Sequence, residues 1–202
     1  MRARMGLMMA KQDVLLRNIV TKDKPAELLA TSPKGTVPVL VLNDGTIIDE
    51  SLDIMLWALK QNDPSDLLYK DRPDTYPQMI SLINDCDQEF RSNLSSYKKS
   101  KRYHLSDEVQ LRTQCEVFIK RLESSLSDQN FLFGDKLSLA DLAILPFARQ
   151  FVNVEKSWFR SAGYPQLSCW LAGLLQSLLF SSAMRKYPLW LENRQEFLLT
   201  WK

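Results

Sequence analysis

The stretch TVPVLVLNDGTIIDES, residues 36–51, constrains the fold of this chain more than any other segment. Two alternating apolar runs flank an Asn-Asp-Gly turn, and an Asp-Gly pair between such runs is a strong β-hairpin signal. Pro38 stands near the head of the first run, although proline lacks an N–H and is normally excluded from strand interiors. The pattern becomes helical at Ser51. The stretch therefore predicts a hairpin (strands 37–42 and 46–49) that continues directly into a helix.

The remaining periodicity predicts a small α/β unit followed by an all-helical unit. A methionine stripe predicts a helix over residues 1–12, a β-branched run predicts a strand over 14–20, and Pro25 opens a short helix. We expect an α/β domain over 1–62, a proline-containing linker over 63–77 and an all-helical domain over 78–202. The helices expected in the second domain span 79–97, 107–126, 139–151 and 167–184.

Residues around the hairpin are candidates for holding a peptide. In isolation, Pro38 is most simply a strand-edge proline; a cis bond would instead turn the backbone N–H and C=O of Val37 outward, to pair with an extended peptide. Ser51, at a helix N-terminus, is either a simple capping residue or a receptor for a carboxylate, and Glu50 beside it can hold an ammonium group. Lys34 is either solvated or the partner of a second carboxylate.

This combination resembles the thioredoxin-like N-terminal domain of cytosolic glutathione S-transferases, and the resemblance extends over nearly the whole chain. It implies that Val37, which precedes the cis-proline Pro38, pairs with the cysteinyl backbone of glutathione. It implies that Glu50 and Ser51 hold the γ-glutamyl head and that Lys34 holds the glycyl carboxylate. A cytoplasmic homodimer is expected, with glutathione and a small electrophile or disulfide as partners.

The second half agrees with the resemblance. Ser138 and Asp141 form a capping box in the sequence SLAD, a signature similar to the one that opens a buried helix in the family's helical domain; alone it is a generic cap. The segments RQFVNVEKSWF, YPQLSCWL and RKYPLW resemble a bacterial branch related to the omega and cysteine-type classes.

In that branch a strand and a Cys-Pro-x-Ala loop precede a helix of the type that MRARM begins here. The resemblance therefore implies that the first strand and the nucleophilic cysteine lie before Met1. We expect no catalytic residue in the chain as written, and weak or no catalysis. In the family fold, the missing strand lies between the strands that correspond to 14–20 and 37–42. Without it, we expect these two strands to close onto one another, another chain to fill the slot between them, or the first domain to be rearranged. An internal methionine taken as the initiator would explain the missing segment.

Several other classes of function are disfavoured. A net charge of +2 is too small to indicate a nucleic-acid or membrane partner, and the three scattered cysteines form no disulfide framework. A single histidine excludes a histidine-based triad and a multi-histidine metal site, so no metal is expected. The sequence has neither a secretory signal nor an apolar run of membrane-spanning length.

The basic segment YKKSKRYH, residues 97–104, allows two interpretations. A solvated loop between helices is the common one, and base stacking on tyrosines interleaved with cations is the other. The resemblance makes Tyr103 a contact for the electrophile.

Two functions follow. The first is glutathione-dependent thiol transfer or conjugation. The second is a non-catalytic interaction module on the same fold, like the stringent-starvation regulators.

Overall fold

In the computed structural model, which describes residues 1–201, the predicted hairpin forms from two short strands, β2 (Leu40–Val41) and β3 (Ile47–Ile48). Gly45 occupies the turn with φ +85°, a left-handed conformation that glycine adopts without steric cost. Both strands are shorter than predicted. The hairpin leads into α3 (Ser51–Gln61), as the change of periodicity indicated.

The chain divides into two compact units. The first unit contains residues 1–65 together with the C-terminal residues from Leu178 onward, and the helical unit is Asp66–Ser177. The sequence placed the segment after residue 177 in the helical domain, whereas in the structure this segment packs as part of the first unit.

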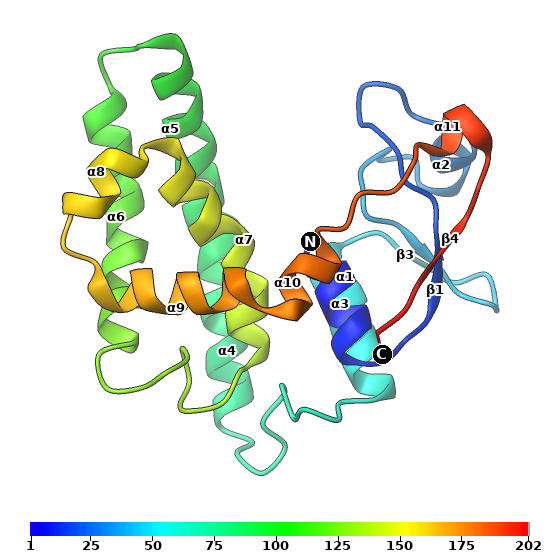
Figure 1. The fold of residues 1–202 in the computed structure, drawn as a ribbon, viewed down its shortest axis with the longest axis horizontal. Helices are drawn as coiled ribbons and strands as arrows, with labels where there is room; N and C mark the ends of the chain where they lie inside the picture. The colour runs from blue at the N-terminus through cyan, green and yellow to red at the C-terminus, as the bar shows by residue number, and fades with distance from the viewer. Residues whose placement is uncertain (202) are drawn as a thin grey trace. The chain divides into compact units, whose positions relative to one another are not determined.

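The first unit is built around two adjacent helices, α1 (Arg2–Met9) and α3, which lie side by side (Figure 1). Met5 and Met8 of α1 are buried, in keeping with the predicted methionine stripe. Gly6 allows the close approach: a Cβ built on it would lie 2.7 Å from Cγ of Met55 and 2.9 Å from its Cα. The helix pair therefore depends on the absence of a side chain at position 6.

A C-terminal strand completes the first unit in a way that the sequence did not indicate. The strand predicted over 14–20 is confined to β1 (Val14–Leu16), which pairs antiparallel with β4 (Phe197–Leu199). Among the described residues β1 does not pair with β2, so the two expected flanking strands do not close onto one another.

Further contacts hold the C-terminal segment beside β1. The Trp190 N–H donates to the Asn18 carbonyl at 2.7 Å, and Asn18 Nδ2 donates to the Tyr187 carbonyl at 2.8 Å. Arg17 forms an ion pair with Glu196 at 2.7 Å. Backbone pairing and side-chain contacts thus join two segments that are far apart in the sequence.

The first helices of the helical unit form one continuous stretch, which consists of α4 (Thr75–Asp85), the π-helix η1 (Cys86–Phe90) and α5 (Arg91–Tyr103). This stretch is longer than the predicted 79–97. The interpretation of residues 97–104 as a loop is therefore wrong: helix continues to Tyr103, and only His104 leaves it, in a left-handed conformation with φ +53°.

The predicted helices 107–126 and 139–151 form as α6 (Glu108–Ser125) and α7 (Leu139–Val154), whereas α8 (Lys156–Ser161) has no counterpart among the predicted helices. Residues 167–184 do not form one helix, because Ser177 adopts an extended conformation and separates α9 (Pro165–Gln176) from α10 (Leu178–Ala183). The remaining elements, α2 (Ala26–Thr31) and α11 (Trp190–Asn193), belong with α10 to the first unit.

Ser138 and Asp141 cap α7 at the centre of the helical unit. The Ser138 side chain accepts from the Asp141 N–H, and the Asp141 carboxylate accepts from the Ser138 N–H at 2.9 Å. Asp141, which is fully buried, also accepts from the Leu132 N–H at 2.9 Å and from Trp170 Nε1 at 2.8 Å. This one carboxylate therefore ties the start of α7 to the preceding loop and to α9.

No helix within residues 1–201 combines the length and the apolar character that crossing a bilayer requires. The same residues contain no cluster of three or more His, Cys, Asp or Glu side chains placed to hold a metal ion.

Candidate functional site

The junction between β3 and α3 brings together most of the predicted ligand-binding residues. Glu50 is the N-cap of α3, and its carbonyl accepts the first helical hydrogen bond from the Ile54 N–H at 3.0 Å. Ser51 is therefore the first helical residue, where backbone N–H groups and the positive end of the helix dipole favour an anion. Its hydroxyl has no hydrogen-bond partner among residues 1–201 and is available to a ligand.

The register of the hairpin places Val37 and Pro38 at the same end. Leu40 pairs with Ile48 and Val41 with Ile47, so continuing this antiparallel alignment past the last pair brings Pro38 level with Glu50 and Val37 level with Ser51. The Val37–Pro38 peptide bond is cis.

Val37 is open to a partner strand. The residue is 44% exposed, and its backbone N–H and C=O have no partner among the described residues. An extended peptide lying beside it would satisfy both groups, in the way that an added strand pairs with a sheet edge.

Lys34 also lies at this corner of the unit, where β3 meets α3. Two carboxylates of the protein already engage its ammonium group. Its Nζ is 3.1 Å from Asp49 Oδ1 and 3.3 Å from Glu50 Oε1. The hydrogen bond from Lys34 lowers the pKa of Asp49, and the bonds to Asp49 and Glu50 raise the pKa of Lys34. The two carboxylates outnumber the single ammonium, which leaves the corner with a net charge of about −1. A ligand ammonium group would be attracted to Glu50.

Sequence reasoning missed two residues of this cluster, Asp49 and Ser32. The Ser32 hydroxyl, buried under the corner, donates to Asp49 Oδ2 at 3.2 Å, so that Asp49 is held by Ser32 and Lys34 together. The acidic doublet Asp49-Glu50 after the hairpin was the available signal. Only the fold shows that residues 32–34 reach it.

The cysteines lie away from this cluster in the chain. All three belong to helices of the helical unit, as the sequence predicted, and the first unit contains none. Cys86 and Cys115 are buried, and burial raises the pKa of the Cys115 thiol to about 12. Cys169 is exposed. The corner formed by Val37, Glu50 and Ser51 therefore provides recognition groups without a thiol.

Tyr103, the predicted contact for the electrophile, lies at the end of α5 in the helical unit. It is 59% exposed, and the Arg102 guanidinium carbon lies 5.7 Å from the centre of its ring. Its role stays a prediction.

Comparison with known proteins adds independent information. Residues 1–66 match the model of the glutathione S-transferase N-terminal domain, and residues 110–173 match that of the glutathione S-transferase C-terminal domain. The first match covers the corner described above, and the second covers α7 with its capping box.

Individual relatives point the same way. Mouse glutathione S-transferase omega-1 is 28% identical over 166 residues, covering 82% of this chain and 67% of the relative. A glutathione S-transferase of Emericella nidulans is 25% identical over 166 residues, covering 78% of this chain. The chain spans only 60% of the length of that fungal relative.

The fold is shared with solved structures. A glutathione transferase homologue from Sulfitobacter, with bound glutathione, superposes with a TM-score of 0.69 at 18% identity, covering 90% of this chain and 89% of that one. The thioredoxin-like N-terminal domain and the all-helical C-terminal domain are thus those of that fold. The chain belongs to the glutathione S-transferase family.

Proposed function

We propose that the first unit binds glutathione and that the protein is a glutathione-dependent transferase. The observation that carries the proposal is the convergence at one end of the hairpin: an unpaired backbone at Val37, an unpaired hydroxyl at Ser51 and a carboxylate at Glu50, all within the described residues. These three groups complement the three polar parts of a γ-glutamyl-cysteinyl peptide.

Each residue has a defined task in this proposal. The Val37 N–H and C=O, next to Pro38, pair with the cysteinyl backbone of the ligand. Ser51 and the N-terminus of α3 receive the γ-glutamyl carboxylate, and Glu50 receives its ammonium group. Lys34 receives the glycyl carboxylate, a task that requires its ammonium to loosen from Glu50 while Asp49 continues to hold it.

The reaction proposed is thiol transfer to a disulfide or conjugation to a small electrophile. We expect this activity to be weak or absent in residues 1–202 alone. The support is the lack of any cysteine in the first unit, combined with the resemblance to a branch that uses a cysteine nucleophile. The mouse omega-class relative supports assignment to that branch.

Retention on immobilised glutathione tests the binding proposal. The full chain is expected to be retained and to elute with free glutathione. The Ser51→Ala variant is expected to bind about tenfold more weakly, since a lost hydrogen bond to a charged group costs about 1.5 kcal/mol. Ser181→Ala is the matched control, because Ser181 is an exposed serine of the same unit. Equal retention of the wild type and the Ser51 variant would contradict the site.

The absence of cysteine from the first unit also favours a second function, a non-catalytic interaction module on the same fold. That function predicts no retention on glutathione by any variant. A homodimer in the cytoplasm stays a prediction of the family resemblance, and light scattering of the purified chain measures its oligomeric state.

A further inference from the structure

A groove along α9 is a second candidate binding site, and it lies wholly within the helical unit. Its volume is about 440 Å³, within the range of small-molecule sites. One wall is the face of α9 that carries Cys169, Trp170, Gly173 and Leu174, which recur at the three- and four-residue spacing of a single helix face. The other wall is the loop between α6 and α7.

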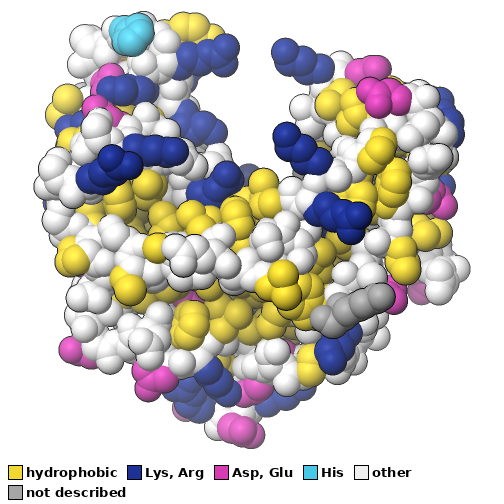
Figure 2. All heavy atoms as spheres, viewed as in Figure 1, with side chains coloured by type: hydrophobic (Ala, Val, Ile, Leu, Met, Phe, Trp, Pro, Cys, Tyr) yellow, Lys and Arg dark blue, Asp and Glu magenta, His cyan; other side chains and the backbone are white. Residues whose placement is uncertain are grey.

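Apolar side chains from both walls line the groove. Phe131 and Leu137 of the loop are half-buried, and Trp170 and Leu174 of α9 are buried. Figure 2 shows hydrophobic side chains at the surface on the part of the helical unit where α9 and this loop lie in Figure 1. Within residues 1–201 the Phe131 ring forms no pair with another aromatic ring. A flat ligand would stack on it.

Gly173 keeps the groove open. Glycine in the interior of a helix destabilises it relative to alanine, so its presence needs a reason. The backbone of Gly173 does not have a positive φ, and a Cβ built on it would meet no heavy atom within 4 Å. Gly6, in contrast, is required by its contact with Met55. Neither conformation nor packing within the described residues accounts for Gly173, whereas space for a ligand does.

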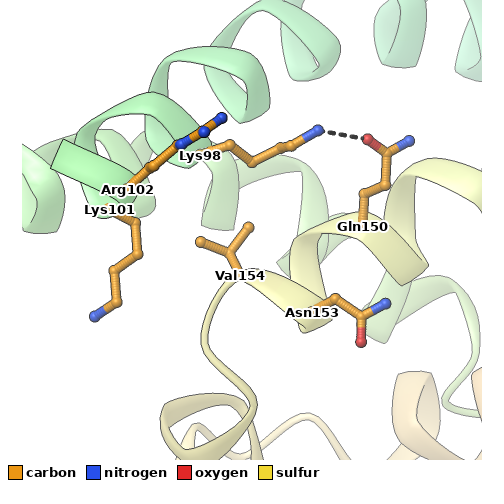
Figure 3. A pocket seen from close by; sticks show the side chains of 6 residues that line it. All are labelled: Lys98, Lys101, Arg102, Gln150, Asn153 and Val154. Carbon is orange, nitrogen blue, oxygen red and sulfur yellow. Dashed lines mark hydrogen bonds between the residues drawn. The ribbon is translucent and has the colours of Figure 1, made fainter.

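The groove offers no charged group to a ligand. None of the residues that line it is acidic or basic. The depression at the C-terminal ends of α5 and α7 differs in this respect, because three basic side chains line it (Figure 3). An ionised ligand in the groove would lose hydration without gaining an ion partner, which is unfavourable. The lining therefore selects a neutral ligand.

Two amides supply hydrogen-bonding groups. Gln129 Nε2 donates to the Ser125 carbonyl at 2.7 Å and to the Leu132 carbonyl at 2.9 Å. These bonds fix the Gln129 side chain, and its Oε1 accepts from no donor among the described residues. The exposed Gln166 side chain has no partner in the same part of the chain. A donor on the ligand thus matches Gln129, and either a donor or an acceptor matches Gln166.

We propose that this groove binds a small neutral molecule that combines an aromatic ring with an amide or a similar hydrogen-bonding group. The ring lies between Phe131 and the face of α9 beside Gly173, and the polar group donates to Gln129. The site goes beyond glutathione binding and uses none of its residues.

Calorimetric titration of the full chain with indole-3-carboxamide tests the proposal. We expect saturable binding that added salt does not weaken, and at least fivefold weaker binding of the anionic indole-3-carboxylate. Gly173→Leu places a side chain in the groove and is expected to weaken carboxamide binding at least tenfold. Ala172→Leu is the matched control, because Ala172 is exposed on the same helix but does not line the groove.

Cys169 gives a second readout at the groove itself, since its exposed thiol lines the groove. Saturating indole-3-carboxamide is expected to slow the alkylation of Cys169 by iodoacetamide at least fivefold in the wild type and in Ala172→Leu. It should give no protection in Gly173→Leu. Peptide mass spectrometry follows the modification.

Several results would overturn the proposal. Absence of carboxamide binding at millimolar concentration would do so, as would equal binding of the carboxylate, an equal loss in Ala172→Leu, or unprotected Cys169 in the saturated wild type. Self-association that Gly173→Leu abolishes and the carboxamide does not affect would assign the groove to a second copy of the chain instead. Circular dichroism of each variant checks that the fold is retained.

Discussion

Lys34 and Asp49 form an ion pair, with Nζ 3.1 Å from Oδ1, at the point where the hairpin passes into α3. The pair connects the loop before the hairpin to the residue next to the proposed ammonium receptor. Lys34 is exposed and Asp49 is partly exposed, so the contribution of the pair to stability is small, but it holds both groups in position at the candidate site.

Replacing Lys34 is expected to change the titration of Asp49. Lys34 lowers the pKa of Asp49, so Lys34→Gln should raise that pKa toward its ordinary value of 3.8. In the native protein, the stability from this carboxylate is present above pH 3.8 and is lost as the pH falls through its lowered folded-state value. Carboxyl-carbon NMR titration measures the shift. An unchanged Asp49 pKa in Lys34→Gln, matching a Lys22→Gln control, would show that the pair does not form in solution.

Gly6→Ala is expected to destabilise the first unit by about 1–3 kcal/mol, the usual cost of overpacking. The new Cβ would lie within 2.9 Å of the Met55 backbone, so α1 and α3 would have to separate. Urea unfolding measures the free energy. Gly173→Ala is the control: Gly173 is also helical but has open space around it, so alanine should stabilise by up to about 1 kcal/mol. Equal effects of the two substitutions would contradict the close packing.

The thiols are expected to differ in their reaction with iodoacetamide at pH 8. Cys169 is exposed and should be alkylated in the folded protein, whereas Cys86 and Cys115 are buried and should not. The pKa of about 12 for Cys115 further reduces its thiolate at this pH. Peptide mass spectrometry locates the modified residue. Modification of Cys115 at the rate of Cys169 would disprove the packing of α6, and unfolding in urea should make all three react.

Asp141→Ala is expected to cost roughly 3–5 kcal/mol, because it leaves buried donors of Ser138, Leu132 and Trp170 without an acceptor. The same urea unfolding assay applies. Asp128→Ala, at an exposed position of the helical unit, should change the free energy of unfolding by less than about 0.5 kcal/mol. A loss below about 1 kcal/mol for Asp141→Ala would contradict the role of this carboxylate in joining α7 to α9.

The parts of the fold that could be predicted are those coded locally. The Asp-Gly turn, the change of period at Ser51 and the capping box at Ser138 each depend on neighbouring residues, and each element appears where its local signal stands. The break at Ser177 and the extension of α5 to Tyr103 were not predictable in this way, since apolar periodicity continues across the first and basic residues obscure the second.

Contacts distant in the sequence were the least predictable. The strand β4 has three residues, and its partner β1 lies about 180 positions earlier, so no local pattern signals the pairing. At the candidate site, Glu50 and Ser51 were recognisable as an acid–hydroxyl pair at a helix start. The engagement of Lys34 by Asp49 depends on how the preceding loop folds back, and only the structure shows it.

The central claim is that Glu50 and Ser51 recognise the γ-glutamyl head of glutathione. Isothermal titration of the full chain with glutathione and with cysteinylglycine, which lacks that head, tests it most directly. We predict measurable binding of glutathione and at least tenfold weaker binding of cysteinylglycine. We also predict that Glu50→Gln and Ser51→Ala lower the affinity for glutathione without changing that for the dipeptide. Equal affinity for the two ligands, or no binding of glutathione at millimolar concentration, would contradict the account.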